Sequence, residues 1–213
     1  MTPAVTTPNV ETGRPGRPRS FDEEAVLDAL MELFWVQGYE ATSMTDIVET
    51  SGLNKSSLYN TFGSKEQLFN RILQRYIERR MSLLTVIADE VGPGIDALHQ
   101  VLAFVRDEMD TEMGRQGCLA INTATEFGRD DPRAQAHALT FRSGMRDSLR
   151  RVVGRAAEDG DLDIEQLDSY ADILLMFLMG LTVVVRAGAD EDELDRLVDA
   201  AHATVEGWRL RTD

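Results

Sequence analysis

The sequence predicts an all-α fold of about nine helices, with three short helices near the N-terminus and a larger helical domain behind them. Apolar residues recur at spacings of three and four along most of the chain, which is the pattern of helices that bury one face. No stretch shows the alternation of apolar and polar residues that is typical of a strand. Capping residues, glycines and prolines divide the helical stretches into separate segments.

The composition is that of an ordinary soluble globular protein. The chain has 213 residues, of which 43% are hydrophobic and 28% charged. Its longest apolar run, residues 173–185, is too short to span a bilayer, which takes roughly 18–20 residues, and the N-terminus does not have the pattern of a signal peptide. One cysteine cannot make an intrachain disulfide or a cysteine-based zinc cluster. We therefore expect a cytoplasmic protein without a membrane partner.

The negative charge is concentrated in the C-terminal part of the chain. The net charge is −15, but residues 1–80 hold 9 Lys and Arg against 11 Asp and Glu, whereas residues 81–213 hold 13 against 26. A surface that binds nucleic acid can be locally basic while the rest of the molecule is acidic. The average charge therefore does not exclude nucleic-acid binding by the N-terminal part.

Residues 1–20 are rich in Thr, Pro and Gly and are expected to form a disordered basic arm. Arg14, Arg17 and Arg19 gather there with no acid among them. Two interpretations remain open. The arm is either a solvated tail or a segment that reaches the minor groove of DNA, as arms that precede DNA-binding helical domains do.

The first predicted helix begins after Ser20, which with Glu23 forms the pattern of a capping box, and it ends at Gly38. Ser43 and Asp46 form a second capping-box pattern, which opens a short helix to about residue 50. The tight turn of residues 51–53 follows.

Asn54 can cap the third helix, residues 55–62, which Gly63 ends. Ser64 and Gln67 then open a fourth helix that extends to about residue 89. A break at residues 92–94 and a loop at residues 114–117 separate the helices that follow. These later helices are expected over residues 95–109, 118–127, 132 to the break at 159, 164–187 and 190–210.

Residues 21–66 have the organisation of a helix-turn-helix domain. Three short helices lie within about 40 residues, and a Ser-Gly-Leu turn joins the second helix to the third. In such a unit the helix after the turn enters the major groove of DNA. Leu58 and Phe62 can pack inward, which leaves hydrogen-bonding side chains for the outer face, and no acid occurs between Glu49 and Glu66.

The segment GYEATSMTDIVETSGLNKSSLYNTFGSKEQLF, residues 38–69, resembles the DNA-binding signature of the TetR/AcrR family of transcription regulators. The G-Y and T-S entry, the S-G-L turn, the S-L-Y-x-x-F helix and the F-G-S-K-E-x-L-F start of the next helix occur in the family's order. The resemblance extends over about residues 17–76. It implies a DNA-binding domain followed by a helical domain that dimerises and binds an effector, here residues 67–213.

The resemblance also implies roles for individual residues. Phosphate contacts would come from Thr42 and Ser43, and contacts to bases or backbone from Lys55, Ser56 and Ser57. Tyr59 and Asn60 would contact phosphate, or a base edge in the case of Asn60. Lys65 would add charge to a helix N-terminus that already favours phosphate. With Arg17 and Arg19 of the arm, these are the predicted DNA-binding residues.

Residues 173–185 are apolar on all sides, so this helix must be covered on all sides. One face would meet the protein's own core and another a second subunit, and with the last helix it would form a four-helix dimer interface, as the resemblance also implies. A purely intrachain core is the alternative. The predicted interface residues are Leu174, Leu178, Leu181, Val185, Leu197, Ala201, Val205 and Trp208.

The helices between the two domains would surround an effector cavity. Apolar bulk would come from Phe104, Phe141 and Met145, and polar contacts from Asn122, Thr125 and also Glu126. An ordinary core is the alternative for the apolar residues.

Cys118 belongs to the same set of candidate effector residues. It lies at the predicted start of a helix with Arg115 nearby, and both features would lower the pKa of its thiol. Cys118 is thus either a sensor of oxidants and electrophiles or a small buried apolar residue.

These observations predict a sequence-specific transcription regulator, which the resemblance makes a repressor released from its operator by a small molecule. Its partners would be a near-palindromic DNA operator, a second copy of the chain and the effector. A redox-sensing regulator that acts through Cys118 is the alternative. No catalytic, metal-binding or cofactor motif is present, so an enzyme is not expected, and a helical interaction module without DNA binding is the remaining rival.

Overall fold

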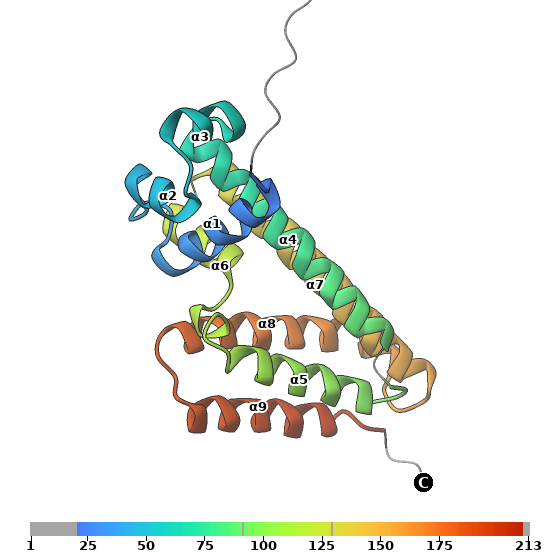
Figure 1. Cartoon of the computed structure of the whole chain (residues 1–213). Coiled ribbons are helices and arrows are strands. Elements are labelled where there is room, and N and C mark those ends of the chain that lie inside the picture. The colour runs from blue at the N-terminus through green and yellow to red at the C-terminus, as the bar shows by residue number, and fades with distance from the viewer. Residues whose placement is uncertain (1–20, 91, 129, 211–213) are drawn as a thin grey trace, which may run out of the picture.

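A computed structural model describes residues 21–90, 92–128 and 130–210. The predicted arm, with Arg17 and Arg19, lies outside the described residues. Over the part that is described, the protein is all-α, with nine α-helices, two short 3₁₀-helices and no strand (Figure 1). The predicted fold class is confirmed.

The first three helices are α1 (Glu23–Gln37), α2 (Met44–Ser51) and α3 (Lys55–Phe62). The N-cap of α1 is Asp22, whose side chain accepts hydrogen bonds from the next backbone N–H groups, so the prediction of Ser20 as the cap is wrong. The α2 capping box forms as predicted, and Asn54 caps α3. Gly52 ends α2 with φ of 66°, the left-handed conformation that glycine adopts without strain.

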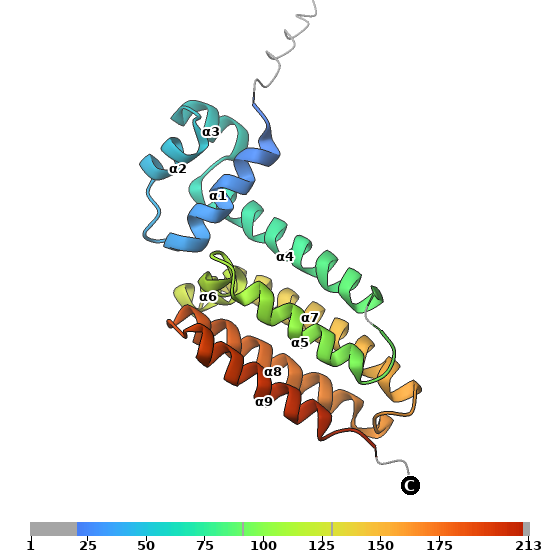
Figure 2. The same cartoon turned by 60° about the horizontal axis from the view of Figure 1, so that its bottom comes forward.

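Helix α4 (Lys65–Glu90) links these three helices to the rest of the molecule. Its predicted capping box forms between Ser64 and Gln67. Both views show α4 running along α7 (Pro132–Glu158), which Asp131 and Pro132 begin as predicted (Figures 1 and 2).

The remaining helices are α5 (Asp96–Met109), α6 (Leu119–Phe127), α8 (Leu167–Arg186) and α9 (Glu191–Glu206). Figure 2 shows α5, α8 and α9 side by side. The predicted loop at residues 114–117 is mostly a 3₁₀-helix, η1 (Gly114–Gln116), and a second one, η2 (Ile164–Gln166), leads into α8. The last helix ends four residues before the predicted Leu210, and Trp208 stacks beyond it on Tyr170 with ring centroids 4.4 Å apart.

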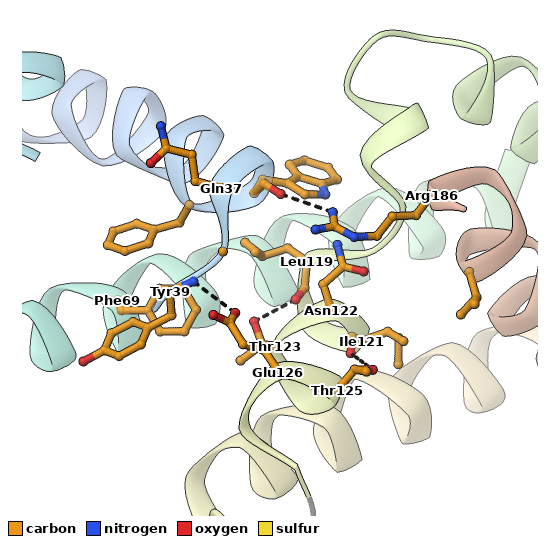
Figure 3. A pocket seen from close by; sticks show the side chains of 14 residues that line it. Gln37, Tyr39, Phe69, Leu119, Ile121, Asn122, Thr123, Thr125, Glu126 and Arg186 are labelled. Carbon is orange, nitrogen blue, oxygen red and sulfur yellow. Dashed lines mark hydrogen bonds between the residues drawn. The ribbon is translucent and has the colours of Figure 1, made fainter. Parts of the chain in front are cut away.

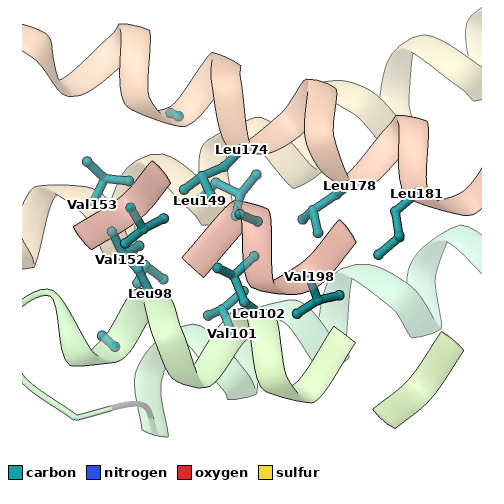
Figure 4. Close-up of a cluster of buried hydrophobic side chains, with 14 of the residues drawn as sticks. Leu98, Val101, Leu102, Leu149, Val152, Val153, Leu174, Leu178, Leu181 and Val198 are labelled. Atoms are coloured by element: carbon teal, nitrogen blue, oxygen red, sulfur yellow. The ribbon is translucent and has the colours of Figure 1, made fainter. Parts of the chain in front are cut away.

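Two apolar clusters hold the fold together. The C-terminal cluster joins α5, α7, α8 and α9 (Figure 4). The N-terminal cluster joins α1 to α4, and it also takes in Leu119 of α6 and Phe141 of α7. The head formed by α1 to α3 is therefore packed on the C-terminal domain through this cluster.

Helix α8 has two apolar faces that point in different directions. Leu174, Leu178, Leu181 and Val185 are at most 4% exposed and belong to the C-terminal cluster. On α9 and after it, Ala201 and Val205 are also buried, and Leu197 and Trp208 are partly buried against the same cluster. The buried residues pack inside the protomer, so their prediction as interface residues is wrong, whereas for Leu197 and Trp208 it stays a prediction.

The second apolar face of α8 is exposed at the protein surface. Ile173, Met176 and Val183 are 39%, 65% and 56% exposed. Each lies one or two positions away from a buried leucine or valine, which is a rotation of about 100° or 200° around the helix. The 3.6-residue period thus divides the all-round apolar sequence into an inner and an outer face.

By length and composition alone, the 23-residue segment Ile164–Arg186 could cross a membrane, since its most apolar part has a mean hydropathy of 1.7. The apolar run itself is still residues 173–185, and the segment is longer because η2 and the first turns of α8, with Glu165, Asp168 and Asp172, precede that run. Its inner face nevertheless packs in the C-terminal cluster.

Candidate functional site

The outer face of α3 is polar and free of acids. Lys55, Ser56 and Asn60 are exposed, and Tyr59 is 46% exposed. Leu58 and Phe62 are buried, as predicted, and fix the helix on the core. The predicted groove-facing side chains therefore point away from the head, although Ser57 is only partly exposed. Ser57 also gives its backbone N–H to the Asn54 side chain, at 2.9 Å.

Two predicted phosphate contacts lie at helix N-termini. Ser43 is exposed at the N-cap of α2, where its hydroxyl accepts the Asp46 N–H at 3.2 Å. Lys65 begins α4, and its ammonium lies 4.2 Å from the centroid of the Tyr39 ring. The aromatic ring holds this cation in place, since the face of such a ring attracts positive charge.

Thr42 is not presented to DNA. Its side chain is 0% exposed, and its hydroxyl donates to the Gly38 carbonyl at 2.6 Å. The expected phosphate contact is therefore wrong for this side chain, which instead closes the turn between α1 and α2. A threonine just before a capping serine has the same sequence pattern in either role.

Four of the six candidate effector residues line one cavity. Phe104, Cys118, Phe141 and Met145 meet between α4, α5, α7 and α8, around a volume of about 50 Å³ that we call the inner cavity. The other two candidates, Asn122 and Thr125, do not reach it.

Asn122 and Thr125 line a second hollow of about 320 Å³, the interdomain cleft, which lies between the end of α1 and helices α6 and α8 (Figure 3). Here hydrogen bonds join the head to the C-terminal domain. The Trp35 indole donates to the Gly117 carbonyl at 3.1 Å, and Arg186 donates to the Trp35 carbonyl at 3.4 Å.

Glu126 makes the most direct of these interdomain contacts. Its carboxylate accepts the backbone N–H groups of Tyr39 and Glu40 at 3.0 Å and 2.7 Å, as Figure 3 shows for Tyr39. We expected Glu126 to contact the effector, but it contacts the α1–α2 loop of the head. Sequence reasoning missed this role, because the partner is a backbone 86 residues away.

Sequence reasoning also missed an ion pair at the inner cavity. Arg80 of α4 contacts Glu108 of α5, and its Nε donates to the Tyr76 hydroxyl at 3.3 Å. Both charged side chains are more than 70% buried. In the sequence Arg80 follows three other arginines on α4, and no local pattern connects it to Glu108.

Cys118 is buried, and burial raises the pKa of its thiol. The predicted lowering is wrong because desolvation outweighs the helix N-terminus. The Tyr76 hydroxyl donates to its sulfur at 3.5 Å, while Arg115 is engaged by Asp110 and by the Ala189 carbonyl. A thiol held in its neutral form is a poor nucleophile, so the structure does not favour the redox alternative.

Comparisons with known proteins agree with the arrangement of the two domains. A model of bacterial regulatory proteins of the tetR family matches residues 26–72, and a model of tetracyclin repressor-like C-terminal domains matches residues 94–208. The HTH-type transcriptional repressor ComR of Escherichia coli K12 is 32% identical over 200 residues, with 91% of each chain covered.

A second curated relative and a solved structure extend this likeness. The HTH-type transcriptional repressor BdcR of Escherichia coli K12 is 26% identical, with 93% of each chain covered. The TetR family regulator CifR, solved as a cysteine mutant with 26 bp of operator DNA, superposes with a TM-score of 0.78 at 25% identity and covers 90% of this chain and 100% of its own. The chain described here belongs to the TetR family of bacterial regulatory proteins.

Proposed function

We propose that the protein is a homodimeric transcription repressor that binds a near-palindromic operator through α3 and releases it when a small molecule binds. The observation that carries this proposal is the exposed, acid-free face of α3, on a chain whose net charge as a whole is −15. The relatives named as repressors and the operator complex of CifR support it. A cytoplasmic location and the absence of enzymatic activity follow from this role.

The outer face of α8 is the surface that we assign to the dimer. Three large apolar side chains, Ile173, Met176 and Val183, are exposed along one side of a single helix. A contiguous exposed apolar stripe marks an interaction site, and a two-fold axis beside it would let two copies cover each other. Two such protomers present two α3 helices, so the half-sites should lie about one helical turn apart, roughly 34 Å, or at a longer related spacing.

Helix α4 connects the effector cavity to the head. Its N-terminus lies beside the Tyr39 ring, and its middle lines the inner cavity with Tyr76 and Arg80. An effector releases DNA only if it binds the DNA-incompetent state more tightly than the competent one. A ligand that displaces α4 would change the separation of the two α3 helices, and two rigid half-sites cannot both be met at the wrong separation.

A mobility-shift assay with the DNA upstream of the protein's own gene tests the proposal. We expect a saturable complex that resists an excess of scrambled DNA and weakens steeply as salt is raised, because phosphate contacts release counterions. Sedimentation of the same sample should give a dimer. A chain that binds scrambled DNA equally well, or that sediments as a monomer at micromolar concentration, would contradict the proposal.

A further inference from the structure

The Arg80–Glu108 ion pair separates two hollows of the protein. The inner cavity lies on one side, and an outer cleft of about 310 Å³ lies on the other, between α1, α4 and the segment around η1. Four residues line both hollows: Tyr76, Arg80, Leu83 and Glu108. Their side chains are therefore the wall between the cleft and the cavity.

The inner cavity offers almost no free polar group. The Tyr76 hydroxyl is engaged by Arg80 and Cys118, and the Thr182 hydroxyl donates to the Met179 carbonyl at 2.8 Å. The rest of the lining is largely aliphatic and aromatic. A ligand body that entered here would have to be apolar, because an unpaired polar group buried in such surroundings is destabilising.

The charged group available to a ligand is the guanidinium in the wall. Arg80 uses Nε for Tyr76 and Nη1 for Glu108, and its Nη2 has no acceptor among the described residues. A planar guanidinium with free N–H groups binds a carboxylate through two parallel hydrogen bonds. Arg80 can therefore accept a ligand carboxylate at the mouth of the cavity.

The surroundings favour an anionic head group over a cationic one. The Arg80 guanidinium lies 5.7 Å and 5.5 Å from the ring centroids of Trp35 and Tyr76, so it already covers the aromatic faces that would attract a cation. The outer cleft is lined by two arginines, Arg79 and Arg80, and by one acid, Glu108. Two cations against one acid in this lining disfavour a ligand cation.

We propose that the effector is a small apolar monocarboxylate, whose carboxylate binds Arg80 in place of Glu108 and whose tail enters the inner cavity. This inference rests on the proposed function and names the ligand class for it. The cavity of about 50 Å³ has to widen for the tail. Met109 and Met145 line it, and the flexible thioether side chains of methionine adapt to such changes.

The same arginine connects the ligand to the head. Arg80 packs on Trp35 of α1, and the Trp35 indole bonds to the Gly117 carbonyl beside α6. A guanidinium that turns towards a ligand carboxylate leaves Glu108 of α5 and shifts against Trp35. Ligand binding at Arg80 would thus displace α1, which is part of the helix-turn-helix domain.

Titration calorimetry of the full-length dimer with hexanoate, hexylamine and hexanol tests the ligand class. The three probes share one apolar tail and differ in the charge of the head group. We expect hexanoate to bind at least about tenfold more tightly than either of the others, since a charge-assisted hydrogen bond is worth that factor or more. Tighter binding of hexylamine, or equal binding of hexanol, overturns the proposal.

Variants of the wall place the carboxylate. Glu108→Gln removes the competing acid and should strengthen hexanoate binding several-fold, whereas Arg80→Gln should abolish the preference for hexanoate over hexanol. Arg79→Gln is the matched control, because Arg79 lines only the outer cleft and pairs with Asp28, and it should leave binding within about twofold. Circular dichroism identifies a variant that does not fold.

Arg80→Gln and Glu108→Gln test the proposal independently of each other. If Arg80→Gln does not fold, the Glu108→Gln result still decides, and weaker or unchanged hexanoate binding there overturns the proposal. Failure of the ligand class and failure of the proposed function are distinguishable, because calorimetry requires no DNA. A protein that shifts its operator but binds no hexanoate contradicts only the ligand class, and a protein that binds hexanoate but no operator contradicts only the function.

Discussion

The outer faces of α3 and α8 are both exposed among the residues that the structure describes, but their chemistry is opposite. Helix α3 presents Lys55, Ser56 and Asn60 and has no acid. Helix α8 presents Ile173, Met176 and Val183, and between its first and last turns its only charged residue is Asp172. A polar, locally basic face is suited to a polyanion such as DNA. An apolar stripe is suited to a second protein surface, so each face is left open for a different partner.

The difference between the two faces of α8 predicts the largest effect. Leu178→Glu places an unpaired charge in the C-terminal cluster and should destabilise the fold by about 3–5 kcal/mol, since a buried charge has no compensation there. Met176→Glu lies on the exposed face and should leave the protomer folded but monomeric. Thermal denaturation and sedimentation separate the two outcomes.

Leu139→Glu is the control for this pair, because Leu139 is also exposed, at 57%, but lies on α7. It should change neither fold nor oligomeric state. If the Met176→Glu protein still sediments as a dimer, the outer face of α8 is not the dimer interface.

The face of α3 predicts the next largest effect. Lys55→Ala should weaken operator binding by about 1–3 kcal/mol if Lys55 contacts a base, and by less if it contacts only phosphate. Arg196→Ala is a matched loss of one exposed cation, on α9 and away from the head. Both are measured by mobility shift at fixed salt, and equal effects of the two variants would show that only net charge matters.

Loss of the hydrogen bonds between the head and the C-terminal domain should have a smaller effect on operator binding. Glu126→Ala removes the acceptor of the Tyr39 and Glu40 N–H groups, which leaves the head less firmly oriented and should weaken operator binding by roughly 0.5–1.5 kcal/mol. Glu126→Gln keeps an acceptor oxygen and should recover part of the loss. Glu112→Gln, at an exposed position outside this contact, is the neutral control. No difference between Glu126→Ala and wild type would mean that the apolar core alone orients the head.

The smallest effect concerns pH at the α5–α9 contact. Burial and the neighbouring His99 lower the pKa of His202 below 6.5, while Asp199 opposes the shift. The His202 Nδ1 lies 2.7 Å from that of His99, whose Nε2 faces Glu206. The unfolded chain binds a proton at His202 more readily than the folded protein does. The free energy of unfolding is therefore at its full value above pH 6.5 and decreases as the pH falls through the lowered pKa of His202.

Melting temperatures of wild type and His202→Gln, compared between neutral and mildly acidic pH, check this dependence. The wild type should lose more stability than the variant as the solution is acidified below pH 6.5. Parallel curves for the two proteins would assign the acid sensitivity to other groups.

The contrast between α3 and the interdomain contacts also explains what the sequence could predict. The boundaries of α2, α3 and α4 follow from caps and glycines a few residues apart, and Leu58 and Phe62 set which side of α3 is exposed. Local spacing determines all of this. Fold class, family and the exposure of most DNA-binding candidates were therefore predictable.

Contacts between distant segments were not predictable in this way. Glu126 binds a backbone in another domain, and Arg80 and Glu108 meet from two helices, so neither pairing leaves a pattern in the sequence. The register of α8 was ambiguous for a related reason. A helix that is apolar all round contains no polar face from which to tell Leu178 inside from Met176 outside.

The two tryptophans of the chain lie at opposite ends of α8, a helix about 30 Å long. Trp35 donates to Gly117 beside the end of α8 and packs under Arg80, whereas Trp208 stacks on Tyr170 near its start. Indole fluorescence responds to the polarity of its surroundings, so the protein contains its own optical reporters of two separate regions. In a Trp208→Phe protein, the remaining emission comes from Trp35 alone and reports the junction between cavity and head, without a label and in real time.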